Sequence, residues 1–288
     1  MRRALFSVVC LVVLAVVALP SAQDRGSLAV SKSVEAGKPF SISTSGSGKA
    51  VLYLVGPQVL RREVELGKTV ELSAGEVHRA GHYVAALVGS GVNAKGEFDV
   101  TPARQPASLI FLAKPSRLAV GQRQGISGVV FVLDGFKNLI LEPLPVSFEL
   151  VAPSGGAQAR SVTTNYGVAW VKMDSATRAG TVQFDASSGS ATAKRVIQQV
   201  PGEPCRLKMS ARPMGERIVL QTEPVRDCNG NPVPDGTIVT FTENYGGKMA
   251  TVDVPLKRGV AQAEMPAYQG AVISAATGVV LGNEIRWH

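Results

Sequence analysis

Asp227-Cys228-Asn229-Gly230-Asn231-Pro232-Val233-Pro234-Asp235-Gly236-Thr237-Ile238-Val239-Thr240-Phe241 is the stretch that decides the fold. Residues 227–236 have the composition of turns, because Asn and Gly accept a positive φ and Pro fixes φ. Residues 237–241 combine β-branched side chains with a terminal aromatic one, which is typical of a short strand. The stretch therefore predicts a tight loop that leads directly into a strand.

An earlier segment, Asp134–Phe148, repeats this arrangement, because Phe follows Asp by 14 residues in both copies. Two further matches follow in the same order. Gly167-Val168-Ala169 corresponds to Gly259-Val260-Ala261, and Gly180-Thr181-Val182 corresponds to Gly270-Ala271-Val272. The spacing between the copies stays between 90 and 93 residues, a drift that loop-length changes between repeated domains explain. The second half of the chain is therefore predicted to contain two homologous domains.

The motif Asp-x-Asn-Gly-Asn-Pro-Val-Pro-Asp-Gly-x-x-Val-x-Phe, followed by Gly-Val-Ala and Gly-x-x-x-x-x-Ala, resembles the bacterial immunoglobulin-like domains of the invasin/intimin group (Big-1 type). The resemblance covers residues 203–288 well and 107–200 less completely, because Gly135-Phe136-Lys137-Asn138 departs from the Asn-Gly-Asn turn. It implies extracytoplasmic β-sandwiches, often in series, that serve as spacers or adhesive modules. The motif positions to which it gives a structural role are Asp227, Asn229, Gly230, Asn231, Pro232, Gly236, Phe241, Gly259 and Gly270.

Short apolar runs separated by glycine and proline turns continue through the whole chain, as expected of β-sandwiches. Residues 27–102 contain seven candidate strands, so we expect a third immunoglobulin-like sandwich there, although its membership in the same family stays open. The predicted fold class is all-β, with three tandem immunoglobulin-like sandwiches at 27–102, 107–200 and 203–288.

The N-terminus has the pattern of a secretory signal peptide. Arg2 and Arg3 precede an apolar run that ends at Pro20, shorter than the roughly 20 apolar residues of a spanning helix. We expect cleavage to remove residues 1–23, so the membrane is contacted only through this peptide. The mature chain then has a formal charge of +6, spread thinly, which speaks against nucleic-acid binding.

Two cysteines, Cys205 and Cys228, remain after export, and an oxidising compartment permits them to pair. One opens the first strand of the last domain and the other follows its second strand. We predict a structural disulfide, with two free thiols or a redox pair as the alternatives.

Oxygen-rich and histidine-containing segments raise the question of metals. The Asp227–Asp235 loop resembles the start of a calcium loop, but its glycine is one position early and the twelfth-position glutamate is absent. We interpret it as turn capping. His78 and His82 have the i,i+4 spacing of a helical zinc site, but Gly81 and the strand after it argue for exposed turn histidines. We therefore predict no metal and no cofactor.

Catalytic signatures are absent from the sequence, which has no nucleophile elbow, HExxH motif or dinucleotide fingerprint, so we predict a protein that is not an enzyme. Trp170 could stack on a sugar, but we expect it to pack in a core or between domains.

The predicted function is a structural or adhesive binding module of the bacterial envelope or exterior. Its expected partner is a protein or polysaccharide of the envelope or of a host or neighbouring surface. A polysaccharide-binding accessory protein and a subunit of an envelope complex are the alternatives. We expect an exported protein that is periplasmic, on the cell surface or secreted.

Overall fold

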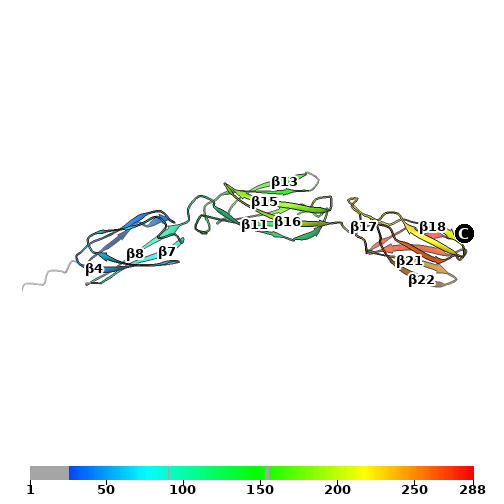
Figure 1. The fold of residues 1–288 in the computed structure, drawn as a ribbon, viewed down its shortest axis with the longest axis horizontal. Coiled ribbons are helices and arrows are strands. Elements are labelled where there is room, and N and C mark those ends of the chain that lie inside the picture. Colours follow the sequence, from blue (N-terminus) through cyan, green and yellow to red (C-terminus); the bar gives the residue numbers. More distant parts are fainter. Residues whose placement is uncertain (1–25, 90, 153–155) are drawn as a thin grey trace, which may run out of the picture. The chain divides into compact units, whose positions relative to one another are not determined.

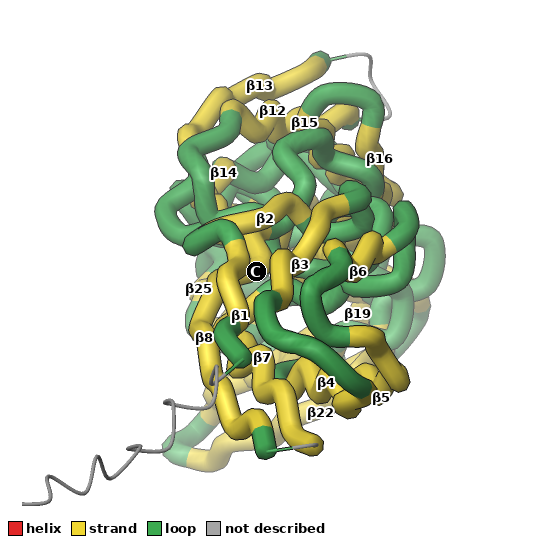
Figure 2. Tube along the Cα trace, turned by 90° about the vertical axis from the view of Figure 1, so that its left-hand side faces the viewer, coloured by secondary structure: helices red, strands yellow, loops and turns green. Residues whose placement is uncertain are grey.

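The computed structural model describes residues 26–89, 91–152 and 156–288, and the predicted signal peptide lies outside these ranges. All regular structure within them is β-structure, and the tube in Figure 2 shows strands and loops without a helix. No helical segment long and apolar enough to cross a membrane occurs in these ranges. The chain forms two compact units, one that ends at Thr101 and one that runs from Pro102 to His288. Each is described by itself.

The first unit is one β-sandwich of a three-stranded and a five-stranded sheet (Figure 1). The sheet orders are β1-β3-β6 and β2-β8-β7-β4-β5, and only the β2–β8 pair is parallel. The strands are β1 (Leu28–Val30), β2 (Ser33–Glu35), β3 (Phe40–Thr44), β4 (Lys49–Val55), β5 (Val59–Glu65), β6 (Thr69–Leu72), β7 (Gly81–Gly89) and β8 (Val92–Thr101).

The second unit begins with a sandwich of the same design. Its sheets have the orders β14-β11-β9 and β10-β16-β15-β12-β13, and β10 pairs with β16 in parallel. Its strands are β9 (Ser108–Lys114), β10 (Arg117–Ala119), β11 (Ile126–Leu133), β12 (Pro145–Val151), β13 (Ala157–Thr163), β14 (Val168–Met173), β15 (Gly180–Ser188) and β16 (Ala191–Val200). Strand for strand, this topology equals that of the first sandwich, so the two share one fold.

The last sandwich keeps the central strands of this plan and changes its edges. One sheet has the order β18-β19-β23, and the other has β22-β21-β24-β25 with β26 also paired to β24. A separate pair, β17–β20, continues the ladder of β18 and β19. The strands are β17 (Pro204–Arg206), β18 (Met209–Met214), β19 (Arg217–Thr222), β20 (Arg226–Asp227), β21 (Ile238–Tyr245), β22 (Lys248–Pro255), β23 (Gln262–Pro266), β24 (Val272–Thr277), β25 (Val280–Leu281) and β26 (Ile285–Arg286).

One edge of this last sandwich lacks a strand that the first two sandwiches have. In the first two sandwiches a three-residue parallel strand, β2 or β10, lies beside the final strand. Only Gly215-Glu216 connects β18 to β19, which leaves no room for such a strand. Among the described strands, none is parallel to β25 or β26, and the neighbouring Val279 and Leu281 are exposed.

Each sandwich has its own hydrophobic core, built by alternation along its strands. In the second sandwich, Phe111, Phe148 and Phe184 are fully buried and contact one another from both sheets. Phe241, the end of the motif, is fully buried in the third core and occupies the place that Phe148 has in the second. The predicted tandem all-β fold is therefore correct.

Candidate functional site

The motif loop 227–231 is organised by the buried carboxylate of Asp227. Oδ1 accepts hydrogen bonds from the backbone N–H groups of Asn229 and Asn231, at 2.9 and 2.8 Å. Oδ2 accepts the Asn231 side-chain amide at 3.0 Å and the N–H of Gly202 at 2.8 Å. Burial alone would raise the pKa of Asp227, but the donors from Gly202, Asn231 and Asn229 outweigh it and hold the pKa below its ordinary value. The carboxylate thus ties the loop to the linker that enters the third sandwich.

The second sandwich contains the same loop, although its sequence differs. Asp134 Oδ1 accepts the N–H groups of Phe136 and Asn138, each at 2.8 Å. Its Oδ2 accepts the Asn138 side-chain amide at 2.9 Å and the N–H of Ala103, in the preceding linker, at 2.9 Å. Asn138 is thus the counterpart of Asn231, and both follow their aspartate by four residues.

The motif asparagine Asn231 also bonds to the preceding sandwich. Its side-chain amide donates to the carbonyl of Thr177 at 2.8 Å, and its Oδ1 accepts the N–H of Ala179 at 2.9 Å. Gly121 lies so close to Asn229 that a Cβ there would come within 2.6 Å of the Asn229 amide nitrogen. The motif loop therefore connects the second and third sandwiches as well as capping its own turn.

The motif glycines have conformational roles. Gly230, Gly236, Gly259 and Gly270 all have positive φ values, between 77° and 90°. Arg258 and Gly259 both have positive φ within a tight hairpin turn, and Tyr166 and Gly167 repeat it. These positions belong to the scaffold of the fold.

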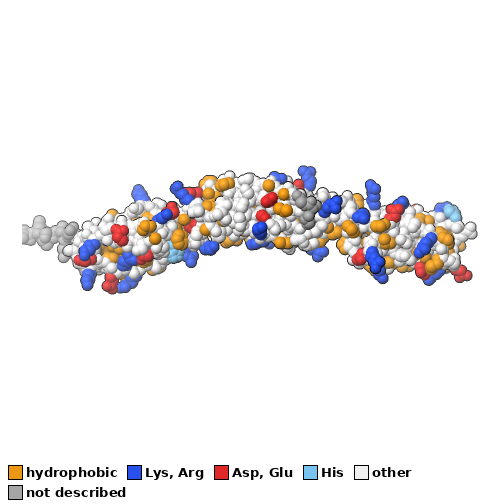
Figure 3. Space-filling model, turned by 45° about the horizontal axis from the view of Figure 1, so that its top comes forward, with side chains coloured by type: hydrophobic (Ala, Val, Ile, Leu, Met, Phe, Trp, Pro, Cys, Tyr) orange, Lys and Arg blue, Asp and Glu red, His pale blue; other side chains and the backbone are white. Residues whose placement is uncertain are grey.

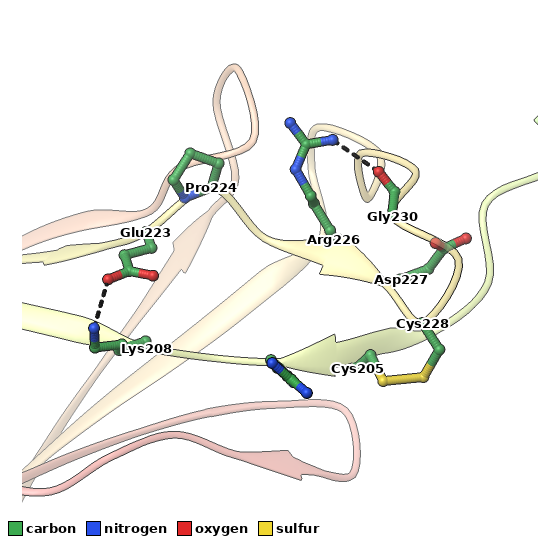
Figure 4. Close-up of a pocket in the computed structure, with 9 residues that line it drawn as sticks. Cys205, Lys208, Glu223, Pro224, Arg226, Asp227, Cys228 and Gly230 are labelled. Carbon is green, nitrogen blue, oxygen red and sulfur yellow. Dashed lines mark hydrogen bonds and ion pairs between the residues drawn. A yellow bond between two sulfur atoms is a disulfide. The ribbon is translucent and has the colours of Figure 1, made fainter. Parts of the chain in front are cut away.

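The predicted disulfide between Cys205 and Cys228 is present, with a Cα–Cα distance of 4.9 Å. It joins β17 to the motif loop at the point where the ladder of β17 and β20 has a register shift. A pocket of about 360 Å³ lies beside it (Figure 4). In Figure 4 the disulfide lies toward one end of the pocket and the ion pair between Lys208 and Glu223, at 2.9 Å, toward the other.

The structure also places the residues considered as metal ligands. All oxygens of Asp227 described above accept N–H groups, which agrees with turn capping rather than a calcium loop. His82 lies in strand β7, not in a turn, and its Nδ1 is 2.9 Å from Asp99 Oδ1. His78 Nδ1 is 3.0 Å from the Gly75 carbonyl. Within the described ranges, no three His, Cys, Asp or Glu residues gather as they would around a metal ion.

The expectation that Trp170 packs in a core or between domains is wrong. In β14 the buried residues are Ala169, Val171 and Met173, so Trp170 points outward and is 64% exposed. It lines a shallow groove together with Arg160 and Lys172. Alternation along the strand places Trp170 on the opposite face from Val171 and Met173, but the sequence did not reveal which of the two faces packs against the core.

A second cavity, which the sequence did not indicate, lies at one end of the third sandwich. It has a volume of about 560 Å³ and is lined by Glu243, Tyr245, Gly246, Lys248, Met249, Ala250, Pro266 and Tyr268. Glu243 is buried, and burial raises its pKa above the ordinary value. The sequence could have indicated this cavity only through Glu243, a charged residue on the same strand face as Phe241.

Charged side chains do not gather into a single patch on the face shown in Figure 3. Lys and Arg are interspersed there with Asp and Glu along all three sandwiches. This distribution agrees with the thin spread of positive charge in the sequence.

Comparison with known proteins identifies the fold. The chain is similar to FdeC, an Escherichia coli adhesin, with a TM-score of 0.57 and 13% identity over 93% of this chain and 98% of that one. It is also similar to invasin, a bacterial integrin-binding protein, with a TM-score of 0.52 and 10% identity over 91% of this chain and 59% of that one. Neither a protein-family model nor a curated protein sequence matches the chain. The fold is thus that of the tandem immunoglobulin-like domains of bacterial adhesins and invasins.

The Asp227 carboxylate generates a stability prediction. Asp227→Asn places an NH₂ group among N–H donors and leaves buried donors without an acceptor, so the free energy of unfolding should fall by about 2–3 kcal/mol. Chemical denaturation followed by circular dichroism measures this. Asp253→Asn is the control, because Asp253 is exposed and accepts a hydrogen bond from the Thr240 hydroxyl at the surface, and it should change stability by less than about 0.5 kcal/mol. Equal effects of the two variants would contradict the assigned role.

The disulfide generates a second prediction. Cys205 and Cys228 close a loop with a sequence separation of 23, so replacing both by serine should lower stability by about 3 kcal/mol in the chain-entropy model. Reductant should destabilise the native protein by a similar amount and leave the double-serine variant unchanged. A native protein insensitive to reductant would show that the bond does not support the fold.

Glu243 generates a prediction about pH. Because its folded pKa is raised, the folded state loses stability relative to the unfolded state as pH rises from the ordinary value of 4.5 through the folded pKa. Lys248, Tyr245 and Tyr268 are the other titratable groups of the cavity. Glu243→Gln should therefore melt at a higher temperature than the native protein at pH 7, and the difference should disappear below pH 4.5. A difference that does not depend on pH would refute the burial of a charge here.

Proposed function

We propose that the chain is an exported, non-enzymatic structural and adhesive module of the bacterial envelope or exterior. The observation that carries this proposal is the similarity of fold to the FdeC adhesin over nearly the whole length of both chains. The similarity to invasin, an integrin-binding protein, supports it. The proposed domains are 27–102, 107–200 and 203–288, each with one of the three hydrophobic cores.

The joint between the second and third sandwiches supports the structural part of this role. A module that holds a binding surface away from a membrane needs linkers with few accessible conformations. Asp227 holds the linker before the third sandwich by a backbone N–H, and Asn231 adds two bonds to the second sandwich. These contacts favour a restrained joint over free rotation of the third sandwich.

A second candidate function is polysaccharide binding. One feature favours it: a cavity with two exposed tyrosines lies in the third sandwich. Aromatic rings with a polar edge are common at surfaces that bind partly apolar, partly polar ligands.

Deletion and complementation in the producing bacterium test the proposal. We expect the full chain to appear in an extracytoplasmic fraction without residues 1–23, as read by mass spectrometry of its N-terminus. Deletion should reduce attachment of the cells to their target surface, and the full-length gene should restore it.

A matched control is complementation with a gene that lacks codons 2–23. Its product should stay in the cytosol and should not restore attachment. Recovery of the native chain from the cytosol with its N-terminus intact, or attachment unaffected by deletion, would overturn the proposal.

A further inference from the structure

Glu243 is a carboxylate placed where the strand pattern requires an apolar residue. Along β21, Val239 and Phe241 face the core, and Glu243 continues that face with only 3% of its surface exposed. Within the described residues its Oε1 atom is buried and accepts no hydrogen bond. Buried polar atoms are nearly always paired, so an unpaired acceptor beside a cavity indicates a partner that arrives from outside.

The walls of this cavity come from both sheets of the sandwich. Glu243, Tyr245 and Lys248 belong to the β21–β22 hairpin, whereas Pro266 ends β23 and Tyr268 follows it. The Tyr245 and Tyr268 rings are stacked, with centroids 4.7 Å apart and planes 7° from parallel. Each ring is 46% exposed, so the pair offers a preformed apolar rim beside the buried carboxyl group.

The chemistry of the lining restricts what this cavity can hold. Oε1 of Glu243 needs a hydrogen-bond donor, and the tyrosine rim, with Met249 and Pro266, needs an apolar face. A cationic side chain would satisfy Glu243, but the exposed ammonium group of Lys248 on the same wall opposes a second positive charge. Lys248 instead offers donors to a neutral acceptor. The occupant should therefore be uncharged, should both donate and accept hydrogen bonds, and should have an apolar face.

We propose that this cavity binds a neutral saccharide residue of a surface glycan. One sugar hydroxyl donates to Glu243 Oε1, another oxygen accepts from the Lys248 ammonium group, and the C–H face of the ring contacts the tyrosine pair. The volume of about 560 Å³ lies within the range of small-ligand pockets. This assignment names the ligand class of the adhesive role and rests on the proposed function for the exposure of the site to glycans.

The exposed Trp170 groove does not meet these requirements. Its lining, which includes Arg160 and Lys172, contains no buried carboxylate without a partner. Asp185 has the buried carboxyl oxygen but not the cavity. Its Oδ1 is buried without a hydrogen-bond partner in the described residues, and Asp185 does not line this cavity. Trp170→Ala and Asp185→Asn are therefore matched controls, one for exposed aromatic surface and one for an unpaired buried carboxyl oxygen.

The experiment applies the purified exported protein to an array of neutral hexose and N-acetylhexosamine oligosaccharides and to polysaccharide from the producing bacterium. Saturation-transfer NMR measures affinity, with N-acetyl-arginine amide as a cationic probe. We expect a neutral saccharide to bind, and Glu243→Gln and Tyr268→Ala each to weaken its binding by about tenfold, since the first replaces a charged acceptor by a weaker neutral one and the second removes one of the two stacked rings. Melting curves verify that both variants fold, and the two controls should bind as the native protein does.

The two ligand sources are distinguished by which arm binds, the array or the bacterial polysaccharide. Absence of saccharide binding in both arms, binding unaffected by Glu243→Gln and Tyr268→Ala, or binding of the arginine probe that depends on Glu243 would overturn the assignment. Any of these results would refute the saccharide site alone if deletion still reduces attachment and the full-length gene restores it. Attachment unaffected by deletion, with saccharide binding retained, would refute the proposed function alone.

Discussion

The motif loops of the last two sandwiches depend on one interaction, a buried carboxylate that accepts hydrogen bonds from four N–H groups. Asp227 and Asp134 each accept two backbone donors within their loop, one side-chain amide and one backbone N–H of the preceding linker. Charged acceptors form stronger hydrogen bonds than neutral ones, and a buried one tolerates no missing donor. The loop conformation, the linker position and the start of the following strand are thus fixed together.

This interaction explains why the motif loop can vary in sequence and keep its shape. Gly230 has a positive φ in the third sandwich, and Lys137, at the matching place in the second, also has a positive φ of 67°. A non-glycine residue in that region is strained, and the four bonds to Asp134 offset the strain. The aspartate and the asparagine four residues later are therefore the essential pair. Glycine eases the positive φ between them but is not required there.

The sequence was sufficient to predict the all-β class, the repeat and the disulfide, because strand alternation, turn residues and cysteine pairing are local or countable signals. It left open how residues 27–102 relate to the rest, since only the strand order reveals that β1–β8 and β9–β16 follow one topology. The outward face of Trp170 and the Tyr245–Tyr268 stack depend on tertiary packing between distant strands. The cavity at Glu243 was visible only as a charge on a core-facing position, a signal that becomes meaningful once β21 has a defined inner face.

The third sandwich departs from the other two at each place where a site occurs. It lacks the parallel edge strand, its first ladder is interrupted and joined by Cys205–Cys228, and its core ends on Glu243 rather than an apolar residue. The first two sandwiches share one regular topology. The missing edge strand, the disulfide and the buried Glu243 therefore all lie in residues 203–288.

Residue-resolved hydrogen exchange of the backbone N–H groups of Gly202 and Ala103 tests the central claim most directly. Both lie in linkers, where exchange is normally fast, and both donate to buried carboxylates. We expect both N–H groups to exchange as slowly as strand N–H groups, and Asp227→Asn to accelerate Gly202 while Ala103 stays protected. Exchange of Gly202 in the native protein as fast as that of Gly246, in the turn between β21 and β22, would contradict the account.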